Sequence, residues 1–411
     1  MITDTTVVVM GLGYIGLPTA AILSSKGVRV HGVDVNRSVV EAVNAGTVPF
    51  VEPDLSGYVQ QAVAAGMLSA STEPITADHY VIAVPTPFQA DRTPDLGYIK
   101  AASEAIAPTI KSGALVILES TSPPHATAQM AEWILNASPD LRGADGEPLI
   151  YFAHCPERVL PGRVMVELVT NDRIVGGTTP QAAELAKELY EVFCEGEILL
   201  TDAVTAEMAK LTENSFRDVN IAFANELSVI CDELGIDVWE LIELANHHPR
   251  VNILQPGPGV GGHCIAVDPW FIVAAAPESS ALIRTAREVN DSKPAWVLNK
   301  VSEATSGKDA PVVALLGLAF KPNIDDLRES PARRIAATIA DEMPHAKIEI
   351  TEPHIEELPR ELANRKNVTL VPMTDNFDGV DCVVLLVDHT AFKAIPMPSG
   401  PAVVDTRGMW R

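Results

Sequence analysis

One cysteine in the chain stands in surroundings that favour chemistry. Cys264 follows a stretch rich in glycine and proline and precedes Asp268 by four residues, in the run QPGPGVGGHCIAVD. Glycines remove side chains, so that backbone can lie against a ligand. A thiol beside such backbone, with a carboxylate close by, suits covalent catalysis on an aldehyde. The competing interpretation is a buried structural cysteine in a tight turn, which is the commoner role of an isolated cysteine.

Length, charge and cysteine usage limit the function classes. The 411 residues predict two or three domains, and the net charge of −24 argues against nucleic acid and anionic membranes as partners. The five cysteines form no CxxC pair, which favours a reducing compartment. The N-terminus lacks a basic signal region, and no apolar run reaches the length of a membrane span. We therefore expect a cytoplasmic protein.

A dinucleotide-binding pattern opens the chain. The apolar run Thr5–Met10 predicts a strand, the glycine fingerprint Gly11–Gly16 follows it, and Leu17–Lys26 predicts a helix. The glycines permit a tight turn and close approach of a pyrophosphate to the helix N-terminus. Asp34 ends the next predicted strand, where an acid accepts the adenosine ribose hydroxyls. This favours NAD over NADP, although the nearby Arg37 could bind the 2′-phosphate of NADP.

Two further predicted strands end in hydroxyl residues. Val81–Val84 leads to Thr86, and Leu115–Leu118 leads to Thr121. Ligands of open parallel sheets lie beyond the carboxyl ends of the strands, so both threonines are candidates to line the nicotinamide half. Helix N-capping is the alternative role for either residue.

A long helix is predicted over Thr201–Leu234, which contains neither glycine nor proline. Thr201 or Asp202 can cap its start. Lys210 and Asn214 lie four residues apart and share one face, although a lysine at such a position is most often a surface lysine. A helix of this length and apolar content is hard for one domain to cover, so we expect it to pack against a second subunit.

The stretch between this helix and the cysteine run contains adjacent histidines. His247 and His248 are predicted to point to different faces of a helix, which argues against a metal pair. Arg250 lies just upstream of the glycines and is a candidate anion binder.

A second α/β unit follows a predicted polar linker over Lys300–Ala310. Strands alternate with helices from Val312 onward, which predicts another parallel sheet. Because this unit lacks a glycine fingerprint, it should bind something other than a second NAD. Lys321, Arg328 and Arg407 lie at or beyond its strand ends, where such sheets bind ligands.

Taken in order, seven motifs resemble the UDP-glucose/UDP-N-acetylmannosamine dehydrogenase family, and most closely its UDP-N-acetyl-D-mannosamine 6-dehydrogenase branch. They are GLGYIGLPTA, VPTPF, ESTSP, CPERVLPG, AEMAKLTENSFRDVNIAFANE, GPGVGGHCIAVDPW and GLAFKPNIDDLRESP, and they cover nearly the whole chain. The resemblance implies an α/β protein, and the long helix predicts a homodimer or a higher oligomer. An N-terminal Rossmann-type NAD domain would span residues 1–200. A central helical domain would span 201–305, and a Rossmann-like UDP-sugar-binding domain 306–411.

The implied reaction is the four-electron oxidation of UDP-N-acetyl-D-mannosamine at C6 to the acid with two NAD⁺, which supplies precursors of surface polysaccharide. Cys264 would form a thiohemiacetal and then a thioester, and Lys210 would stabilise the oxyanion. Asn214 would hold the reacting oxygen. The water that hydrolyses the thioester would be placed by Glu157, Asp268 and Thr121. UDP-N-acetylglucosamine and UDP-glucose remain alternative substrates.

The resemblance also implies two sets of binding residues. Those for the cofactor are Gly11, Gly13, Tyr14, Ile15, Gly16, Asp34, Arg37, Thr86, Thr121 and Arg328, the last near the pyrophosphate. Those for the substrate are Glu157, Arg158, Val159, Lys210, Asn214, Arg250, Asn252, Gly261, Phe320, Lys321 and Arg407. Among these, Arg250 would reach the diphosphate of a neighbouring subunit's substrate, and no metal site is implied.

One departure from the family pattern follows ESTSP. The family usually has an apolar residue, then glycine, then Ser or Thr and Thr, where this chain has Pro124-His125-Ala126-Thr127. The missing glycine bears on the local backbone rather than on the chemistry.

Two other classes of protein compete with a UDP-sugar dehydrogenase as the interpretation of this sequence. A hydroxyacid dehydrogenase would need neither Cys264 nor the C-terminal unit, and a regulator without turnover would not need the catalytic set.

Overall fold

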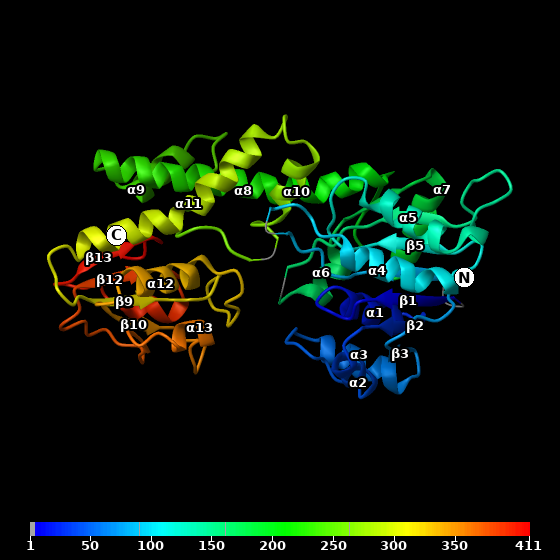
Figure 1. Ribbon diagram of the computed structural model, residues 1–411, viewed down its shortest axis with the longest axis horizontal. Helices are drawn as coiled ribbons and strands as arrows, with labels where there is room; N and C mark the ends of the chain where they lie inside the picture. Colours follow the sequence, from blue (N-terminus) through cyan, green and yellow to red (C-terminus); the bar gives the residue numbers. More distant parts are fainter. Residues whose placement is uncertain (1–4, 90, 161, 263) are drawn as a thin grey trace. The chain divides into compact units, whose positions relative to one another are not determined.

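The computed structural model describes residues 5–89, 91–160, 162–262 and 264–411 and divides into two compact units (Figure 1). The first unit contains residues 1–213 and 270–276, and the second contains residues 214–269 and 277–411. The long helix α8 (Ala203–Leu234) begins in the first unit and continues in the second. The short helix α10 (Asp268–Ala275) also has residues of both.

The first unit is built on an eight-stranded sheet in the order β3-β2-β1-β4-β5-β6-β7-β8. Strands β6 and β7 run antiparallel, and the other neighbouring strands run parallel. The strands are β1 (Thr6–Met10), β2 (Arg29–Val33), β3 (Leu68–Ser71), β4 (His79–Ile82), β5 (Leu115–Leu118), β6 (Tyr151–His154), β7 (Arg173–Gly177) and β8 (Ile198–Asp202). The helices are α1 (Gly16–Ser25), α2 (Arg37–Asn44), α3 (Leu55–Ala64), α4 (Gly97–Ile106), α5 (Ala126–Ala137), α6 (Val164–Thr170) and α7 (Pro180–Tyr190), with short 3-10 turns at Ala107–Thr109 and Pro139–Leu141.

Both faces of this sheet are covered, because its central strands are apolar along their whole length. Successive side chains of a strand point to opposite faces. Val7 and Val9 of β1 accordingly pack into the core that includes α1, and Val8 packs into the core on the other face, which includes α4 and α5. The predicted strand–glycine–helix start of the chain is confirmed within one or two residues at each boundary.

The second unit contains a five-stranded parallel sheet in the order β11-β10-β9-β12-β13. Its strands are β9 (Val312–Leu316), β10 (Lys347–Thr351), β11 (Val368–Leu370), β12 (Cys382–Leu385) and β13 (Ala402–Asp405). Its helices are α9 (Val238–Asn246), α11 (Ala281–Ala304), α12 (Pro331–Glu342) and α13 (Arg360–Ala363), with a 3-10 turn at Thr390–Ala394. The expected second α/β unit with a parallel sheet is thus confirmed.

Helix α8 starts and stops as its sequence suggests. The Asp202 carboxylate accepts a hydrogen bond from the backbone N–H of Thr205 at 2.9 Å, which caps the first turn. Gly235, with φ of 68°, follows the last residue. Thr201, the other predicted cap, belongs to β8. No helix in the described part of the chain is both long and apolar enough to cross a membrane.

Two local predictions are wrong. Residues 300–304 of the predicted linker form the last turn of α11, where Val301 is fully buried in the core and Lys300 forms an ion pair with Asp232 of α8 at 2.6 Å. His247 and His248 do not lie within a helix, since α9 ends at Asn246. Pro249 disfavours helical backbone in the residue before it, which accounts for the early end.

Candidate active site

The glycine fingerprint forms a cradle after β1. A Cβ atom on Gly11 would lie 2.7 Å from the carbonyl oxygen of Ala83, and one on Gly16 would lie 1.9 Å from the carbonyl oxygen of Gly11. Only glycine fits at these two positions. The third glycine differs, because a Cβ on Gly13 would meet no atom within 4 Å. The open space at Gly13 fits the approach of a pyrophosphate.

Asp34 lies beside this cradle. Its carboxylate accepts hydrogen bonds from the backbone N–H of Leu12 at 2.9 Å and of Asn36 at 2.8 Å. No side chain caps α1 at Ile15, which leaves the start of the helix suited to an anion, although the backbone N–H of Leu17 donates to the carbonyl oxygen of Gly13 at 3.1 Å. Arg37 is exposed in the first turn of α2. These residues fit a dinucleotide whose ribose hydroxyls meet Asp34.

Other predicted cofactor residues border the same cradle. The Tyr14 hydroxyl donates to the carbonyl oxygen of Val51 at 3.0 Å, and its ring stacks on Phe50 with 4.8 Å between centroids. The Thr86 hydroxyl donates to the carbonyl oxygen of Thr121 at 2.5 Å. The structure therefore brings the ends of β4 and β5 together through the two predicted threonines.

Glu157 is held in a buried ion pair. Its side chain is 7% exposed, and one carboxylate oxygen accepts from the Arg173 guanidinium at 3.3 Å. The other oxygen accepts from the backbone N–H of Arg158 at 2.7 Å. The Arg158 side chain itself pairs with Glu213 at 2.7 Å, and Val159 packs against the core.

A second carboxylate shares the surroundings of Arg173. Glu119 is 1% exposed and accepts from the hydroxyls of Thr19 and Tyr190, each at 3.1 Å. Burial, followed by the nearby charge of Glu157, raises the pKa of Glu119 to about 8, although Arg173 acts in the opposite direction. One guanidinium faces two buried carboxyl groups here, so Glu119 carries a proton near neutral pH.

The neighbouring Cys155 belongs to this buried cluster rather than to any reactive site. Its sulfur lies 3.7 Å from Arg173, and burial raises the pKa of its thiol to about 12. A thiol that is buried and protonated is a poor nucleophile. Cys264, by contrast, is exposed.

In the second unit a chain of hydrogen bonds joins three predicted catalytic residues. The backbone N–H of Asp268 donates to the carbonyl oxygen of Cys264 at 2.8 Å, and that of Val267 donates to the same oxygen at 3.0 Å. The Asp268 side chain, 4% exposed, accepts from the Asn214 amide at 2.6 Å. Helix α8 carries Lys210 four residues before Asn214.

The glycine stretch before Cys264 is fitted closely to its neighbours. A Cβ on Gly261 would lie 2.6 Å from the Pro331 ring and 3.1 Å from Cβ of Phe320. One on Gly257 would lie 2.7 Å from the guanidinium of Arg407. The backbone N–H of Gly257 also donates to the side chain of Asn225 on α8 at 2.8 Å. Glycine is required at Gly261, where the Pro331 ring and the carbonyl oxygen of Glu329 cannot move aside, whereas at Gly257 the end of the Arg407 side chain could shift.

A second group of predicted substrate residues lies beyond the carboxyl ends of the strands in the second sheet. A small cavity there is lined by residues including Pro258, Gly259, Phe320, Asp388 and Arg407. The Arg407 guanidinium donates to the Asp388 carboxylate at 2.7 Å. An arginine held at the carboxyl end of a strand, beside an aromatic ring, is suited to a nucleotide diphosphate.

The remaining predicted residues are solvent-facing. Lys321, Arg250 and Asn252 are exposed. Arg328 is exposed as well, and its guanidinium donates hydrogen bonds to both carboxylate oxygens of Asp326.

Several supporting residues escaped sequence reasoning. Arg173 and Glu119 surround Glu157, Asn225 holds Gly257, and Glu207 of α8 accepts from the backbone N–H groups of His125 and Thr127 at the start of α5. The one available signal was a charged residue inside a segment predicted to be buried, as at Glu119 directly after β5.

Comparisons with known proteins cover the whole of this architecture. Residues 5–194 match the NAD binding domain of the UDP-glucose/GDP-mannose dehydrogenase family, residues 204–292 its central domain and residues 314–411 its UDP binding domain. A UDP-N-acetyl-D-mannosamine dehydrogenase of Salmonella typhi is 56% identical, covering 99% of each chain. An NDP-N-acetyl-D-galactosaminuronic acid dehydrogenase of Ralstonia nicotianae is also 56% identical, covering 98% of this chain and 96% of the relative. The solved UDP-D-ManNAc dehydrogenase of Pyrococcus horikoshii matches with a TM-score of 0.86 and 36% identity, covering 99% of this chain and 96% of that one.

Proposed function

We propose, because this chain belongs to the UDP-glucose/GDP-mannose dehydrogenase family, that it oxidises UDP-N-acetyl-D-mannosamine at C6 to the carboxylate with two NAD⁺. The observation that carries the proposal is the exposed Cys264, linked by hydrogen bonds to Asp268 and through it to Asn214. The relative named UDP-N-acetyl-D-mannosamine dehydrogenase supports the choice of sugar. The product would be a precursor of surface polysaccharide.

The residues of this chain have separate roles in the proposed reaction. NAD⁺, when bound, accepts the hydride from C6 in each of the two oxidations. The Cys264 thiolate adds to the aldehyde carbon after the first hydride has left, and Lys210 stabilises the resulting oxyanion. Loss of the second hydride converts the thiohemiacetal to a thioester. A water placed by Glu157, Asp268 and Thr121 then hydrolyses the thioester, which releases the acid and restores the thiol.

The binding roles follow the same division. We assign the cofactor to the cradle of Gly11, Gly13 and Gly16 with Asp34, and the UDP half of the substrate to the cavity of Phe320 and Arg407. Arg328 is assigned to the cofactor pyrophosphate, and Arg250 to the diphosphate of a substrate in a neighbouring subunit.

The proposal also includes a cytoplasmic location and three domains, which span residues 1–200, 201–305 and 306–411. The sequence has an odd number of cysteines and no CxxC pair, which supports this location.

A homodimer is also part of the proposal. Phe216, Phe223 and Ile230 of α8 lie seven residues apart and are 68%, 51% and 43% exposed. A spacing of seven places them on one face of the helix. Large apolar side chains in such a row favour burial against another surface, and a second copy of α8 offers a matching one.

The direct test is NADH production from a panel of UDP-sugars. We expect the highest kcat/KM with UDP-N-acetyl-D-mannosamine, and two NADH for each acid formed. The panel includes UDP-N-acetyl-D-galactosamine, because an equally similar relative carries an N-acetylgalactosaminuronic acid name. It also includes UDP-N-acetylglucosamine and UDP-glucose. A clear preference for one of these three would refute the sugar assignment but leave the chemistry standing.

Asp34 predicts the cofactor preference. Its carboxylate faces the ribose position and would repel a 2′-phosphate. We expect kcat/KM with NAD to exceed that with NADP by at least about a hundredfold, and Asp34→Ala to reduce this ratio. Comparable use of NADP by the wild type would contradict the assignment and make Arg37 the determining residue.

A further inference from the structure

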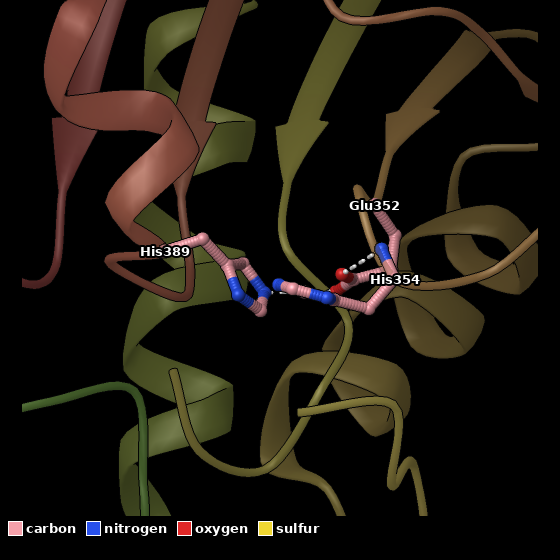
Figure 2. Close-up of side chains that lie close together, drawn as sticks. All are labelled: Glu352, His354 and His389. Carbon is pink, nitrogen blue, oxygen red and sulfur yellow. Dashed lines mark hydrogen bonds and ion pairs between the residues drawn. The ribbon is translucent and has the colours of Figure 1, made fainter. Parts of the chain in front are cut away.

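Three side chains outside the proposed chemistry converge in the second unit. Glu352 and His354 follow β10, and His389 follows β12 (Figure 2). One ligand-type atom from each lies within 4.8 Å of the others. Glu352 and His389 are buried, and His354 is exposed. Such a group could hold a metal ion or serve a different purpose, and its hydrogen bonds distinguish the two.

Both ring nitrogens of His389 are already engaged. Its Nδ1 accepts from the backbone N–H of Asn323 at 2.9 Å, so the proton of the neutral ring is on Nε2. Nε2 donates to the Glu352 carboxylate at 3.0 Å. The same carboxylate oxygen accepts from the backbone N–H groups of Leu318 at 2.7 Å and Ala319 at 3.1 Å. A metal ion would have to displace these bonds.

The bonds hold the two ends of one loop. Glu352 binds the backbone where the loop leaves β9, and His389 binds it at Asn323. Asn323 has φ of 63°, in the left-handed region that is unfavourable for most residues. Its side chain exchanges two further hydrogen bonds with Thr390, at 3.0 and 2.8 Å. Phe320 and Lys321 lie between the two anchored ends.

We propose that His389 is a positioning residue for substrate binding, which fixes the loop of residues 318–323 so that Phe320 and Lys321 meet the UDP-sugar. This inference rests on the proposed function of the loop. It assigns to His389 no contact with substrate. The hydrogen bonds of Glu352 with His389, Leu318 and Ala319 complete a buried network in which no strong donor is left unpaired.

A matched pair of variants separates the two bonds of His389. His389→Asn keeps an oxygen near the position of Nδ1 and can still accept from Asn323, whereas His389→Gln keeps a donor near Nε2 but loses that acceptor. We expect His389→Gln to raise KM for UDP-N-acetyl-D-mannosamine about tenfold, as for one lost hydrogen bond to a backbone donor. KM for NAD and kcat should stay near wild type, and His389→Asn should lie closer to wild type than His389→Gln. His345→Ala, which removes an exposed histidine outside this cluster, is the control and should behave as the wild type.

Binding of UDP, measured by calorimetry, keeps this test separate from the proposed function. A wild type that binds no UDP would refute the proposed function, whereas equal UDP affinity of wild type and His389→Gln would overturn the positioning role. Equal changes in KM for NAD and for the UDP-sugar would mean that His389 contributes only to the general stability of the protein, and they would also overturn the positioning role. Stoichiometric Zn²⁺ binding that is lost in His354→Ala would overturn it in favour of a metal site. If His389→Gln does not fold, Glu352→Gln tests the other end of the loop, where the same rise in KM is expected and its absence overturns the proposal.

Discussion

At the scale of residues, the proposed site depends on charges that are held by partners far along the chain. Glu157 is fixed by Arg173, and the second buried carboxyl group, that of Glu119, is satisfied by two hydroxyls. Removing one member of a buried ion pair leaves an uncompensated charge, which is more costly than removing the pair. Replacement of Arg173 would therefore disturb Glu157 even though Arg173 has no proposed role in the chemistry.

The protonation of Glu119 predicts a dependence of stability on pH. Its pKa rises from an ordinary value of 4.5 to about 8 in the folded protein, mainly through burial. Between these values the unfolded chain releases the proton and the folded chain keeps it. The free energy of unfolding therefore falls as pH rises, by up to about 1.4 kcal/mol per pH unit. The groups that face Glu119 are Glu157, Arg173, Cys155 and Tyr190.

Glu119→Gln removes this titration while keeping the size of the side chain. We expect the stability of the variant relative to wild type to increase between pH 5 and pH 8, as measured by denaturant unfolding at several pH values. Contributions of other carboxylates cancel in the difference between the two proteins. A difference that does not change with pH would show that Glu119 is ionised in the folded state.

At the scale of elements, the start of α5 shows how the chain accommodates the missing glycine. His125 occupies the position before the helix with φ of 73°. Its backbone N–H and that of Thr127 donate to the Glu207 carboxylate at 2.6 and 2.7 Å. A buried carboxylate at a helix N-terminus is favourable because it binds N–H groups that lack partners in the helix. The turn is thus retained without glycine.

His125→Gly should relieve the strain of this turn. The left-handed conformation costs a residue with a side chain about 1–2 kcal/mol, and the greater freedom of unfolded glycine offsets about half of that gain. We expect His125→Gly to be more stable than wild type by roughly 0.5–1 kcal/mol, and His125→Ala to show no gain. Thermal and denaturant unfolding measure this difference. A clear loss of stability in the glycine variant would mean that the exposed His125 side chain makes a favourable contact.

Sequence reasoning captured the elements better than the contacts between them. The strands named in the sequence analysis and the glycine fingerprint were predictable, because alternation, apolar runs and turn residues are local features, whereas β3, β7 and β8 were not predicted. The pairing of His389 with Asn323, 66 residues apart, was not, because it depends on which strands become neighbours. The end of α11 was read as a linker because its residues are polar, and the ion pair of Lys300 with Asp232 could not be read from composition.

At the scale of the whole molecule, the two sheets repeat one strand order. The order β3-β2-β1-β4-β5 in the first unit matches β11-β10-β9-β12-β13 in the second. In both, an acid after the second strand accepts backbone N–H bonds from the turn after the first, Asp34 from Leu12 and Glu352 from Leu318. The second unit uses this arrangement without a glycine fingerprint, so the sequence predicted its parallel sheet but not the shared role of Asp34 and Glu352.

The apolar row on α8 predicts a dimer that point substitutions can weaken. Phe216→Ser combined with Phe223→Ser removes two exposed aromatic side chains from one helix face. We expect the wild type to be dimeric and the double variant to dissociate at micromolar concentration, as measured by light scattering. Leu282→Ser, which removes a side chain that is 69% exposed on α11, is the control and should remain dimeric. A monomeric, active wild type would refute the dimer.

The role of Cys264 is tested most directly by following the acid product and the enzyme's mass in wild type, Cys264→Ala and Cys264→Ser. The wild type should form two NADH per acid. The alanine variant should bind UDP-sugar normally and form no acid, because the aldehyde then meets no nucleophile. The serine variant should stall as a covalent adduct visible by mass spectrometry, since an alkoxide is a much poorer leaving group than a thiolate. Near-normal acid formation by Cys264→Ala would contradict the proposed covalent mechanism.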